Sequence, residues 1–577
     1  MYMKINGIRV AVEPDMTIIQ AARKAGFYIP SLCSMEGVHE IGSCRICVVE
    51  VKGARTLIPA CITRVEEDME VFTHTARVRR ARKTILELIL SDHPPDECLT
   101  CEKNNQCELQ KLAVQMNVQQ IRYEGEPSPR IIDDESPAVV RDSAKCILCR
   151  RCVTVCSQIQ GVNAIAPIGR GFNTVIAPAG RAFIMKSPCV QCGQCINVCP
   201  TGALTEKTDV DRVWRALEDP RIYTVVQAAP AVRVSIGEIF GLEPGTSVTG
   251  KLVSSLKRLG FDRVFDTNFS ADLTIMEEVS ELIQRIDEGR SLPMITSCSP
   301  GWINYLEYFF PHLTDHLSTC KSPQQMFGAL IKTYYAQKLG ISADRIFTVS
   351  VMPCTAKKYE SQRPEMYSSG YRDVDAVLTT RELGAMLKEA GIDLLSGAEY
   401  SFDEPFGPGS GAGAIFGNTG GVMEAALRTA YEILTGEELR DLEFHQVRNL
   451  PGIKEAGVNI GDMKLSVAVI HGLGNIREVL EDIEKGNSPY HFIEVMCCPG
   501  GCIGGGGQPF SDDPDVRQKR IAGLYREDAK LPVRKSHENP AVQQLYREFL
   551  GKPLGQKSHK LLHTRYSNRY ELLQKVD

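Results

Sequence analysis

The residues best suited to chemistry lie in the stretch Glu494–Pro509, whose sequence is EVMCCPGGCIGGGGQP. Cys498 and Cys502 stand four positions apart, Met496 precedes them, and a run of glycines follows. Thiolates are the ligands that soft metals and iron–sulfur clusters select. Glycine has no Cβ and tolerates positive φ, so a glycine-rich backbone can approach a bulky inorganic group closely. The stretch therefore predicts one wall of an iron–sulfur cluster pocket.

Cysteine is abundant in the rest of the chain, with 21 copies among 577 residues. Many of them fall in tight C-x-x-C sets, and the first residues, MYMKINGIRVAVEP, predict a β-strand rather than a signal peptide. C-x-x-C sets outside a secretory context favour metal binding over disulfides. We therefore expect several clusters and a cytoplasmic location.

Composition sets the broad class of the protein. The length fits three or four domains. A net charge of −5 argues against nucleic acid as a main partner. No apolar run approaches the ~18 residues that indicate a membrane span, so we expect no membrane partner.

The first segment, residues 1–78, is rich in β-strand and turn signals. Its four cysteines follow the spacing C-x10-C-x2-C-x13-C, which suits a [2Fe–2S] cluster, and a zinc site is the alternative. These predicted ligands are Cys33, Cys44, Cys47 and Cys61.

The second segment, residues 79–125, combines one histidine with three cysteines. A helix is predicted just before them, at residues 77–90, and the basic residues of its first half are expected to form a solvated face. Three thiolates and one imidazole can hold a [4Fe–4S] cluster, whereas a histidine on its own is usually a surface or capping residue. The predicted ligands are His93, Cys98, Cys101 and Cys107.

A connector at residues 125–140, rich in Pro, Ser and acidic residues, precedes a third segment at 139–208. Here the run C-x2-C-x2-C-x3-C occurs twice, which is the bacterial two-cluster ferredoxin pattern. In that fold the fourth cysteine of each run ligates the other cluster. One [4Fe–4S] cluster is then expected on Cys146, Cys149, Cys152 and Cys199, and a second on Cys189, Cys192, Cys195 and Cys156.

From residue 209 to 577 the pattern changes to one large α/β domain. Short apolar runs predict buried, largely parallel strands, and helices are expected at Ile275–Arg285 and Val422–Leu434. Three of the strands end at a cysteine, and sites in α/β sheets form beyond the carboxyl ends of strands. The charged segment Lys519–Asp577 is expected to wrap this domain. The strand-like runs are IYTVVQAAP, LPMITSCSP, IFTVSVMPC, KLSVAVIHGLG and YHFIEVMCC.

The glycine-rich stretch Gly409–Gly421 invites a nucleotide-binding interpretation. It lacks G-x-G-x-x-G, no clear strand precedes it, and the chain has no Walker A motif. Close approach of the backbone to the cluster pocket, near Phe416, explains these glycines better. We expect this chain itself to bind neither NAD nor flavin.

Two further cysteine motifs extend the pattern, Cys298 in TSCSPGW and Cys354 in MPCTAKKYE. With Glu494–Pro509 they are similar to the signatures TSCCPxW, MPCxxKxxE and ExMxCxxGCxxGGGQP of the [FeFe]-hydrogenases. The resemblance covers essentially the whole chain. It implies a multidomain α/β and α+β protein: a β-grasp ferredoxin-like N-terminus, a His/Cys cluster domain, a bacterial two-cluster ferredoxin-like domain and a large α/β hydrogenase domain. Relatives have H-x3-C before the second cluster, where this chain has H-x4-C, so the loop between His93 and Cys98 is one residue longer.

The resemblance also implies an H-cluster, in which a [4Fe–4S] cube shares one cysteine, matching Cys502, with a two-iron unit carrying CO, cyanide and a dithiolate amine. The other cube ligands are expected among Cys298, Cys354 and Cys498. Lys357 is expected to donate to a cyanide. Relatives often carry Ser where this chain has Ala231, so one hydrogen bond is expected to be missing. The remaining pocket positions match Pro230, Pro323, Gln324, Met352, Phe416 and Met496.

The pair Cys298–Ser299 departs from the family pattern. In TSCCPxW the second cysteine ligates the cube and the first relays protons, so by register Ser299 falls on the ligand position. A serine alkoxide is a poor substitute for a thiolate. Either Cys298 shifts to ligate the cube and Ser299 relays protons, or the cube is unusual. The sequence favours Cys298 as the ligand.

A proton route is implied by further matches at Glu278, Glu281, Ser318 and Arg285. The two glutamates and the arginine are three and four positions apart, so one helix face can carry them. An exposed Glu281–Arg285 ion pair is the structural alternative. Two remaining cysteines, Cys320 and Cys497, are expected to be small buried hydrophobes.

The predicted function is reversible H2 oxidation and proton reduction, with one [2Fe–2S] and three accessory [4Fe–4S] clusters carrying electrons. Ferredoxin is an expected partner, as are a flavin- and NAD(P)-binding subunit and a small iron–sulfur subunit. Two alternatives are an electron-transfer subunit without chemistry and a hydrogenase-like sensory protein with little turnover.

Overall fold

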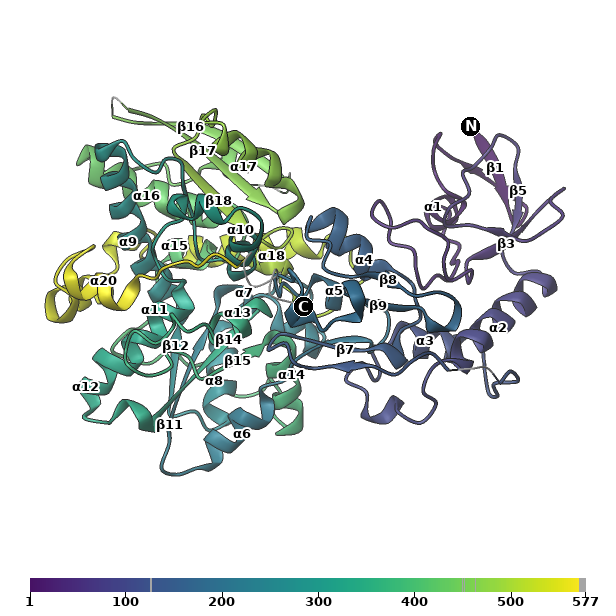
Figure 1. Cartoon of the computed structure of the whole chain (residues 1–577), viewed down its shortest axis with the longest axis horizontal. Helices are drawn as coiled ribbons and strands as arrows, with labels where there is room; N and C mark the ends of the chain where they lie inside the picture. Colours follow the sequence, from purple (N-terminus) through teal and green to yellow (C-terminus); the bar gives the residue numbers. More distant parts are fainter. Residues whose placement is uncertain (125–126, 449, 451, 462, 570–577) are drawn as a thin grey trace. The chain divides into compact units, whose positions relative to one another are not determined.

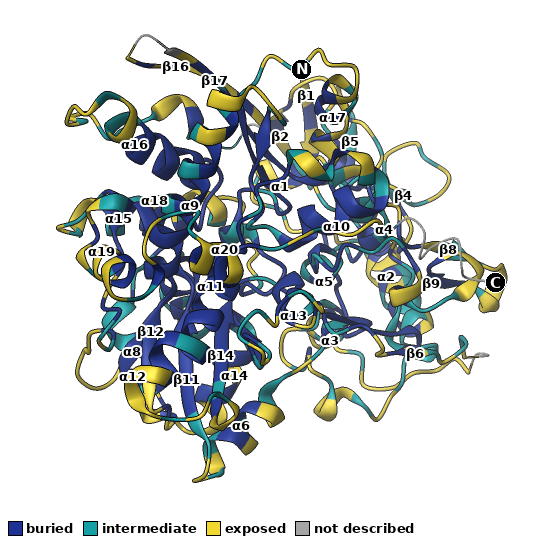
Figure 2. Ribbon diagram, turned by 60° about the vertical axis from the view of Figure 1, so that its left-hand side comes forward, coloured by how far each residue is buried: buried dark blue, intermediate teal, exposed yellow. Residues whose placement is uncertain are grey.

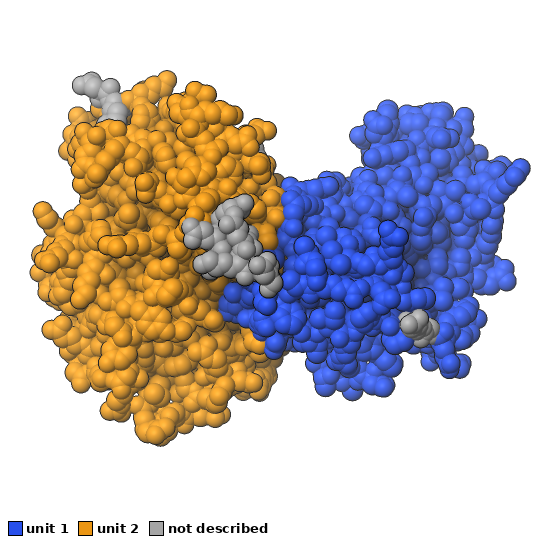
Figure 3. Space-filling model, viewed as in Figure 1, with its two compact units in different colours: residues 1–158, 163–187, 198–205 blue, residues 159–162, 188–197, 206–577 orange. Residues whose placement is uncertain are grey.

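The computed structural model describes residues 1–124, 127–448, 450, 452–461 and 463–569. Two residues of the connector predicted at 125–140, and the end of the predicted C-terminal wrap at 570–577, lie outside the described residues. The chain forms two compact units, coloured separately in Figure 3. Unit 1 comprises 1–158, 163–187 and 198–205, and unit 2 comprises 159–162, 188–197 and 206–577.

Unit 1 begins with a mixed five-stranded sheet in the order β2-β1-β5-β3-β4, covered by helix α1. The β1–β5 pair is parallel and the other pairs are antiparallel. Thr17 starts α1 with a capping box that also involves Gln20. Ile5 and Ile18 lie in the core between helix and sheet. The bounds are β1 Tyr2–Ile5, β2 Ile8–Ala11, α1 Ile18–Lys24, β3 Val48–Val51, β4 Ile58–Pro59 and β5 Glu70–Phe72.

Helix α2, Ala76–Ser91, lies where residues 77–90 predict a helix, and Thr75 caps its N-terminus. Arg77, Arg79 and Arg80 are exposed, as expected for a solvated face. Arg82 is buried instead, and its guanidinium donates to the carbonyl of Val48 at 2.8 and 3.1 Å. The remaining elements of unit 1 are α3 Glu108–Gln115, β6 Ile132–Asp133, β7 Val139–Asp142, α4 Arg151–Thr154, β8 Ala166–Ile168, β9 Val175–Ala177 and β10 Leu204–Glu206.

Unit 2 contains two four-stranded sheets, so the predicted parallel strands are divided between them. The first has the order β12-β11-β14-β15 and is parallel throughout. The second has the order β13-β18-β17-β16, in which β16, a strand that was not predicted, pairs antiparallel to β17. The bounds are β11 Tyr223–Ala228, β12 Arg263–Asp266, β13 Met294–Ile295, β14 Ile346–Met352, β15 Ala376–Thr379, β16 Ile453–Ile460, β17 Met463–His471 and β18 Phe492–Met496.

Helix α9, Thr267–Glu288, packs against both sheets of unit 2. One side of it, including Ile275 and Val279, lies in the cluster of apolar residues formed with β17 and β18. Phe269 and Leu273 lie instead in the cluster formed with β11, β12 and β14. Figure 1 shows α9 beside α11, α15 and α16, and Figure 2 shows the first sheet coloured mostly as buried. The helix predicted at Ile275–Arg285 is the central part of α9.

Other helices surround these sheets, and helix α16 contains the predicted helix Val422–Leu434. Their bounds are α5 Gln194–Asn197, α6 Val210–Glu218, α7 Pro230–Arg233, α8 Thr249–Arg258, α10 Pro300–Phe309, α11 Pro323–Leu330, α12 Ala336–Leu339, α13 Ala356–Glu360, α14 Thr380–Glu389, α15 Gly411–Ile415, α16 Gly421–Thr435 and α17 Arg477–Glu484. Among the described residues, no helix combines the length and apolar character needed to cross a bilayer.

The last described segment carries α18 Val516–Lys530, α19 Pro540–Leu545 and α20 Gln556–Leu562. Val542 and Leu562 are buried in the same core as Phe265 of β12. Arg569 makes an ion pair with Glu307 at 2.7 Å. The segment is therefore joined to the core of unit 2 up to its last described residue.

Candidate active site and cluster sites

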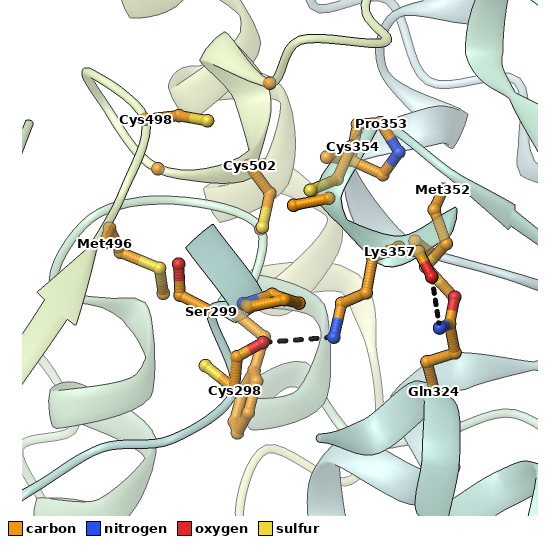
Figure 4. A pocket seen from close by; sticks show the side chains of 18 of the residues that line it. Cys298, Ser299, Gln324, Met352, Pro353, Cys354, Lys357, Met496, Cys498 and Cys502 are labelled. Atoms are coloured by element: carbon orange, nitrogen blue, oxygen red, sulfur yellow. Dashed lines mark hydrogen bonds between the residues drawn. The ribbon is translucent and has the colours of Figure 1, made fainter. Parts of the chain in front are cut away.

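Three strands of unit 2 deliver cysteines to one buried cavity. Strand β13 is followed by Cys298, β14 by Cys354 and β18 by Cys498, so the carboxyl ends of strands from both sheets converge. Cys502, in the turn after Cys498, lines the same cavity. Figure 4 shows these cysteines around the pocket, with Lys357 near its centre and Met352 and Met496 on opposite sides.

Glycines of the motif Glu494–Pro509 let this part of the cavity lining pack directly against neighbouring loops. Gly501 has φ +88°, and a Cβ on it would lie 2.7 Å from the backbone nitrogen of Thr419. A Cβ on Gly505 would lie 2.0 Å from the carbonyl oxygen of Pro353. Neither position has room for a side chain, so the motif needs glycine to pass beside the neighbouring loops.

Glu494, which opens the motif, holds this wall against helix α16. Its carboxylate accepts the backbone N–H groups of Gly420 at 2.6 Å and Met423 at 2.7 Å. These N–H groups belong to the start of the helix, where donors are unpaired and a negative charge is favoured. Glu494 therefore positions the motif against helix α16. From the sequence, it was identified only as the first residue of the motif.

Most of the other predicted pocket residues line the cavity with apolar surface. Met352, Met496 and Phe416 are almost fully buried. Ala231 presents a methyl group and no hydroxyl at its position on α7. The residues of this set that line the cavity are Pro230, Ala231, Pro323, Gln324, Met352, Phe416 and Met496.

Two polar side chains enter this apolar surface. The Lys357 amine donates to the carbonyl of Cys298 at 3.0 Å and to Glu360 at 3.0 and 3.2 Å. The Gln324 amide donates to Glu360 at 3.1 Å and to the Lys357 carbonyl at 3.3 Å. Among the described residues, the buried Oε1 of Gln324 has no hydrogen-bond partner. Such an orphan acceptor in a cavity lining indicates a missing bound group.

Cys298 and Ser299 lie differently in this pocket. In Figure 4 the Cys298 sulfur lies apart from the sulfurs of Cys354, Cys498 and Cys502. Burial, and then the nearby carboxyl of Glu278, raise the pKa of Cys298 well above its usual value. The Ser299 hydroxyl lines the cavity and accepts the backbone N–H of Cys497 at 3.2 Å.

The predicted proton-route residues form a buried group on α9 and the loop after His316. Ser318 is hydrogen-bonded to Glu278 and also donates to Glu281 at 3.4 Å. Arg285 pairs with Glu281 at 2.6 Å. Glu281 is 7% and Arg285 9% exposed, so this is a buried pair and not the exposed ion pair of the structural alternative. Burial raises the pKa of Glu278 to about 8, so its carboxyl is largely protonated at neutral pH.

Sequence patterns missed the groups that surround Glu281. Thr319 donates to its carboxylate through the backbone at 3.0 Å and through its hydroxyl at 3.0 Å. The Cys320 thiol lies 4.0 Å from the same carboxylate, and Cys320 is buried as expected. His563, from the C-terminal segment, contacts Thr319 at 2.7 Å. Thr319 and Cys320 directly follow Ser318 but belong to no motif, and His563 lies 243 or more residues further along the chain, so no periodicity or spacing could have brought them together.

In unit 1 the cysteines of the first segment converge beneath the five-stranded sheet. Cys33, Cys44, Cys47 and Cys61 are all buried. The sulfurs of Cys47 and Cys61 are 3.3 Å apart, and the Cys33 sulfur accepts the backbone N–H of Cys44 at 3.5 Å. Four converging thiols with backbone donors fit a small iron–sulfur cluster.

His93 lines a second cavity of unit 1 together with Cys98, Cys101 and Cys107. Its Nδ1 contacts the Pro94 carbonyl at 3.3 Å. Nε2 is buried and has no partner in the part of the chain that the structure describes. Burial, the largest influence, lowers the pKa of this imidazole, which keeps a ring nitrogen free to ligate. The extra residue before Cys98 is thus accommodated in the loop.

A third cavity of unit 1 brings Cys199 to the first ferredoxin-like run. It is lined by Cys146, Cys149 and Cys152 together with Cys199, the four residues that the spacing predicts as ligands of one cluster. Cys156 belongs to unit 1, whereas Cys189, Cys192 and Cys195 belong to unit 2. The second cluster of this pair therefore remains a prediction from the sequence.

Comparison with known proteins identifies the large domain. Residues 222–506 match the family described as "Iron only hydrogenase large subunit, C-terminal domain". The NADP-reducing hydrogenase subunit HndD of Solidesulfovibrio fructosivorans is 50% identical to this chain, over 98% of the chain and 99% of the relative. The chain belongs to the [FeFe]-hydrogenase family. This hydrogenase is therefore a catalytic subunit that carries accessory iron–sulfur domains.

Further family matches cover the segments of the hydrogenase before and after the large domain. Residues 2–76 match a 2Fe-2S iron–sulfur cluster binding domain, 82–122 an NADH-ubiquinone oxidoreductase-G iron–sulfur binding region, and 136–205 the ferredoxin-like domain of NADH-quinone oxidoreductase subunit 3. Residues 514–569 match the iron hydrogenase small subunit, here carried in the same chain.

Two other relatives agree with this assignment. Iron hydrogenase 1 of Clostridium pasteurianum is 42% identical over 97% of the hydrogenase chain and 99% of the relative. A solved structure of a variant of [FeFe]-hydrogenase HydA1 from Chlamydomonas reinhardtii superposes with a TM-score of 0.57 at 44% identity. It covers 63% of this chain and 99% of that chain.

Proposed function

We propose that this hydrogenase interconverts H2 with protons and electrons at an H-cluster held in the cavity of unit 2. The observation that carries the proposal is the donor set of that cavity. Cys354, Cys498 and Cys502 offer three thiols. The Lys357 amine and the Gln324 oxygen, which has no hydrogen-bond partner among the described residues, are polar groups in an otherwise apolar lining. When bound, the H-cluster supplies an open iron site and an amine base for making or splitting H2.

The protein's own contribution is to hold and shield the group. Cys354, Cys498 and Cys502 would hold the iron–sulfur part of the H-cluster through their thiolates. Lys357 is a compact cation suited to a cyanide ligand, and burial among methionines and Phe416 excludes water. Ala231 offers no hydroxyl, so one cyanide contact available in many relatives is absent from the proposed arrangement.

We propose that Cys298 relays protons and that Ser299 stands at the fourth corner of the cube, the reverse of the assignment that the sequence favoured. Support comes from the position of the Cys298 sulfur, which lies apart from the other thiols in Figure 4, and from the nearby carboxyl of Glu278, which with burial raises the pKa of Cys298. Protons would then pass between the Cys298 thiol and the Glu278 carboxyl, and on through Ser318 to Glu281 and Arg285.

A Ser299→Cys variant tests this assignment. A thiolate in place of a hydroxyl should change the reduction potential and the electron paramagnetic resonance spectrum of the cube, because the ligand type sets cluster potential. Cys298→Ser should leave the cube intact. If Ser299→Cys alters neither property and Cys298→Ser loses four iron atoms, Cys298 is the ligand instead.

Accessory clusters would carry electrons between the active site and partner proteins. We propose one [2Fe–2S] cluster on the first segment, one [4Fe–4S] cluster on His93 and its three cysteines, and two more on the ferredoxin-like runs. The 50% identity to a subunit named NADP-reducing hydrogenase supports a complex with a flavin- and NAD(P)-binding subunit and a small iron–sulfur subunit. Ferredoxin is the other proposed partner.

Infrared spectroscopy of the matured protein tests the proposed function. Intrinsic CO and CN stretching bands, together with H2 evolution from a reduced dye, are the expected result. A protein that contains its full iron complement but never develops these bands would not hold an H-cluster, and the proposal would fail.

One observation favours a second candidate function, a hydrogenase-like sensory protein with little turnover: this chain naturally has Ser299 where the family pattern has a cysteine. The same experiment distinguishes it. Such a protein would develop the CO and CN bands and respond to H2 by changes in these bands, while its rate of H2 evolution stays near the background of the reduced dye.

A further inference from the structure

A continuous hydrogen-bonded path leads away from Glu281 toward the C-terminal segment. The Thr319 hydroxyl donates to the Glu281 carboxylate at 3.0 Å and contacts Nδ1 of His563 at 2.7 Å. Nε2 of His563 contacts the Glu277 carboxylate at 3.1 Å. His563 and Glu277 are each almost fully buried, so the path runs through the interior of unit 2.

Glu277 lies beside Glu278 on α9 but belongs to this second path. Its carboxylate also accepts hydrogen bonds from the hydroxyls of Tyr546 and Ser558 and from the backbone N–H of Leu554. Burial alone would raise the pKa of Glu277, but these hydrogen bonds and that of His563 outweigh it and lower the pKa. A carboxylate that stays ionised can receive the proton of a histidine.

The hydrogen-bonded path ends at the buried carboxylate of Glu277, and helix α20 brings an exposed group close to His563. His559 on this helix is exposed, and its ring stacks on that of His563 with centroids 4.8 Å apart and planes 3° apart. Ser558, the partner of Glu277, stands in the first turn of the same helix. The charged and titratable groups around His563 are Glu277, Glu281 and Arg285 on α9, the Cys320 thiol, His559 on α20, Tyr546 and Tyr566.

We propose that Thr319, His563 and Glu277 form a second branch of the proton route, which joins the first branch at Glu281. This inference rests on the proposed function, since it concerns the protons of the same reaction. It gives the C-terminal segment, which matches a small hydrogenase subunit, a role in proton delivery. Arg285 would serve one exit from Glu281 and His563 the other.

Each transfer conserves the proton. Protonated Glu281 gives its proton to the Thr319 oxygen while the Thr319 hydroxyl gives its own to Nδ1 of His563. The resulting imidazolium releases the proton on Nε2 to Glu277, so no charge is left on the ring. Rotation of the ring, or the reverse transfer during H2 production, restores the starting tautomer. Thr319 and His563 act through Glu281 and are positioning and relay residues, not catalytic ones.

The variant His563→Gln separates proton transfer from packing. Glutamine can keep the hydrogen bond to Glu277 but cannot take up a proton at neutral pH. His537→Gln is the matched control. His537 also joins the C-terminal segment to a helix through a glutamate and a threonine, Glu432 at 2.7 Å and Thr429 at 3.3 Å, and neither residue belongs to the path.

Parallel branches predict synergy between variants. His563→Gln alone should lower H2 turnover about two- to fivefold, because Arg285 still serves the other exit. In the Arg285→Gln background the same change should lower it by a further ~50-fold or more, and Thr319→Val should act similarly. A further loss of only about two- to fivefold in that background, matched by His537→Gln, would mean that His563 has a structural role only.

A second measurement does not depend on turnover. Glu278 is protonated at neutral pH, so transfer of the protein into D2O should shift the carbonyl band of its carboxyl group, assigned by its loss in Glu278→Gln. In the Arg285→Gln background we expect His563→Gln to slow this shift at least about tenfold, and His537→Gln to leave it unchanged. An unchanged exchange rate would overturn the branch even if the protein makes H2.

The same experiment separates the two proposals and one rival. If CO and CN bands are absent but the exchange rate depends on His563, the proposed function fails while the path stands.

The ligand atoms of Glu281, Cys320 and His563 lie within 4.8 Å of one another, as in a metal site. Zinc bound by the parent protein and lost in His563→Gln would identify a structural metal instead and overturn the branch.

Discussion

Replacement of Glu278 by glutamine is expected to lower H2 turnover by about 10²–10⁴-fold, the usual loss on removing a proton-transfer group. Glutamine has nearly the same shape, so the buried hydrogen bond to Ser318 can persist while proton transfer stops. Steady-state H2 evolution measures the loss. Unchanged CO and CN infrared bands in the variant would establish that the active-site group is still assembled.

The pH dependence of the parent protein gives the control for this variant. Because burial raises the pKa of Glu278 to about 8, its carboxyl carries the proton below that pH and loses it above. H2 evolution, which needs a proton at Glu278, should therefore decline as the pH rises through about 8. The residual activity of Glu278→Gln should lack this decline. Activity within about twofold of the parent would exclude Glu278 from the proton route.

Replacement of Lys357 by methionine is expected to abolish turnover by a different cause. The Lys357 amine donates to Glu360 and to the carbonyl of Cys298 within the pocket. Methionine removes the cation proposed to hold a cyanide ligand and leaves the buried Glu360 carboxylate without a counter-charge. We expect the CO and CN bands to disappear and the free energy of unfolding to fall by about 3–5 kcal/mol.

Lys358 provides a matched control for that change. It is the next residue on α13, is fully buried, and pairs with Glu382 at 2.9 Å. Lys358→Met should lower stability by a similar amount, about 3–5 kcal/mol in chemical denaturation, yet retain the CO and CN bands. If both variants lose the bands equally, loss of stability rather than loss of a specific contact explains Lys357→Met.

Local patterns in the sequence were sufficient for the strands and cysteines that form the site. The apolar runs that end at Cys298, Cys354 and Cys498 are β13, β14 and β18, because buried parallel strands need continuous apolar residues. The spacing of Cys146, Cys149 and Cys152 also predicted the arrival of Cys199, which lines the same cavity. In each case the signal lies within a few residues of the chain.

Features that depend on distant contacts could not be predicted in this way. The division of the strands between two sheets depends on how α9 packs against both of them. The position of the Cys298 side chain depends on the turn before α10. The register of the motif and the preference of a cube for thiolates pointed to different ligands, so the sequence left the choice between Cys298 and Ser299 open. His563 meets Thr319 only because α20 packs against the core, and an isolated histidine in a charged segment carries no pattern.

The positions of the lining residues along the chain determine at what stage of synthesis and folding the cavity can form. Its lining extends from Cys192 through Ala229, directly after β11, to Gly505, and the helices that follow complete the core around it. A ribosome must therefore release almost the whole chain before these walls can meet, and such distant contacts form slowly. We expect the cofactor to enter a chain that is already folded, so the order of biosynthesis is protein first and metal last.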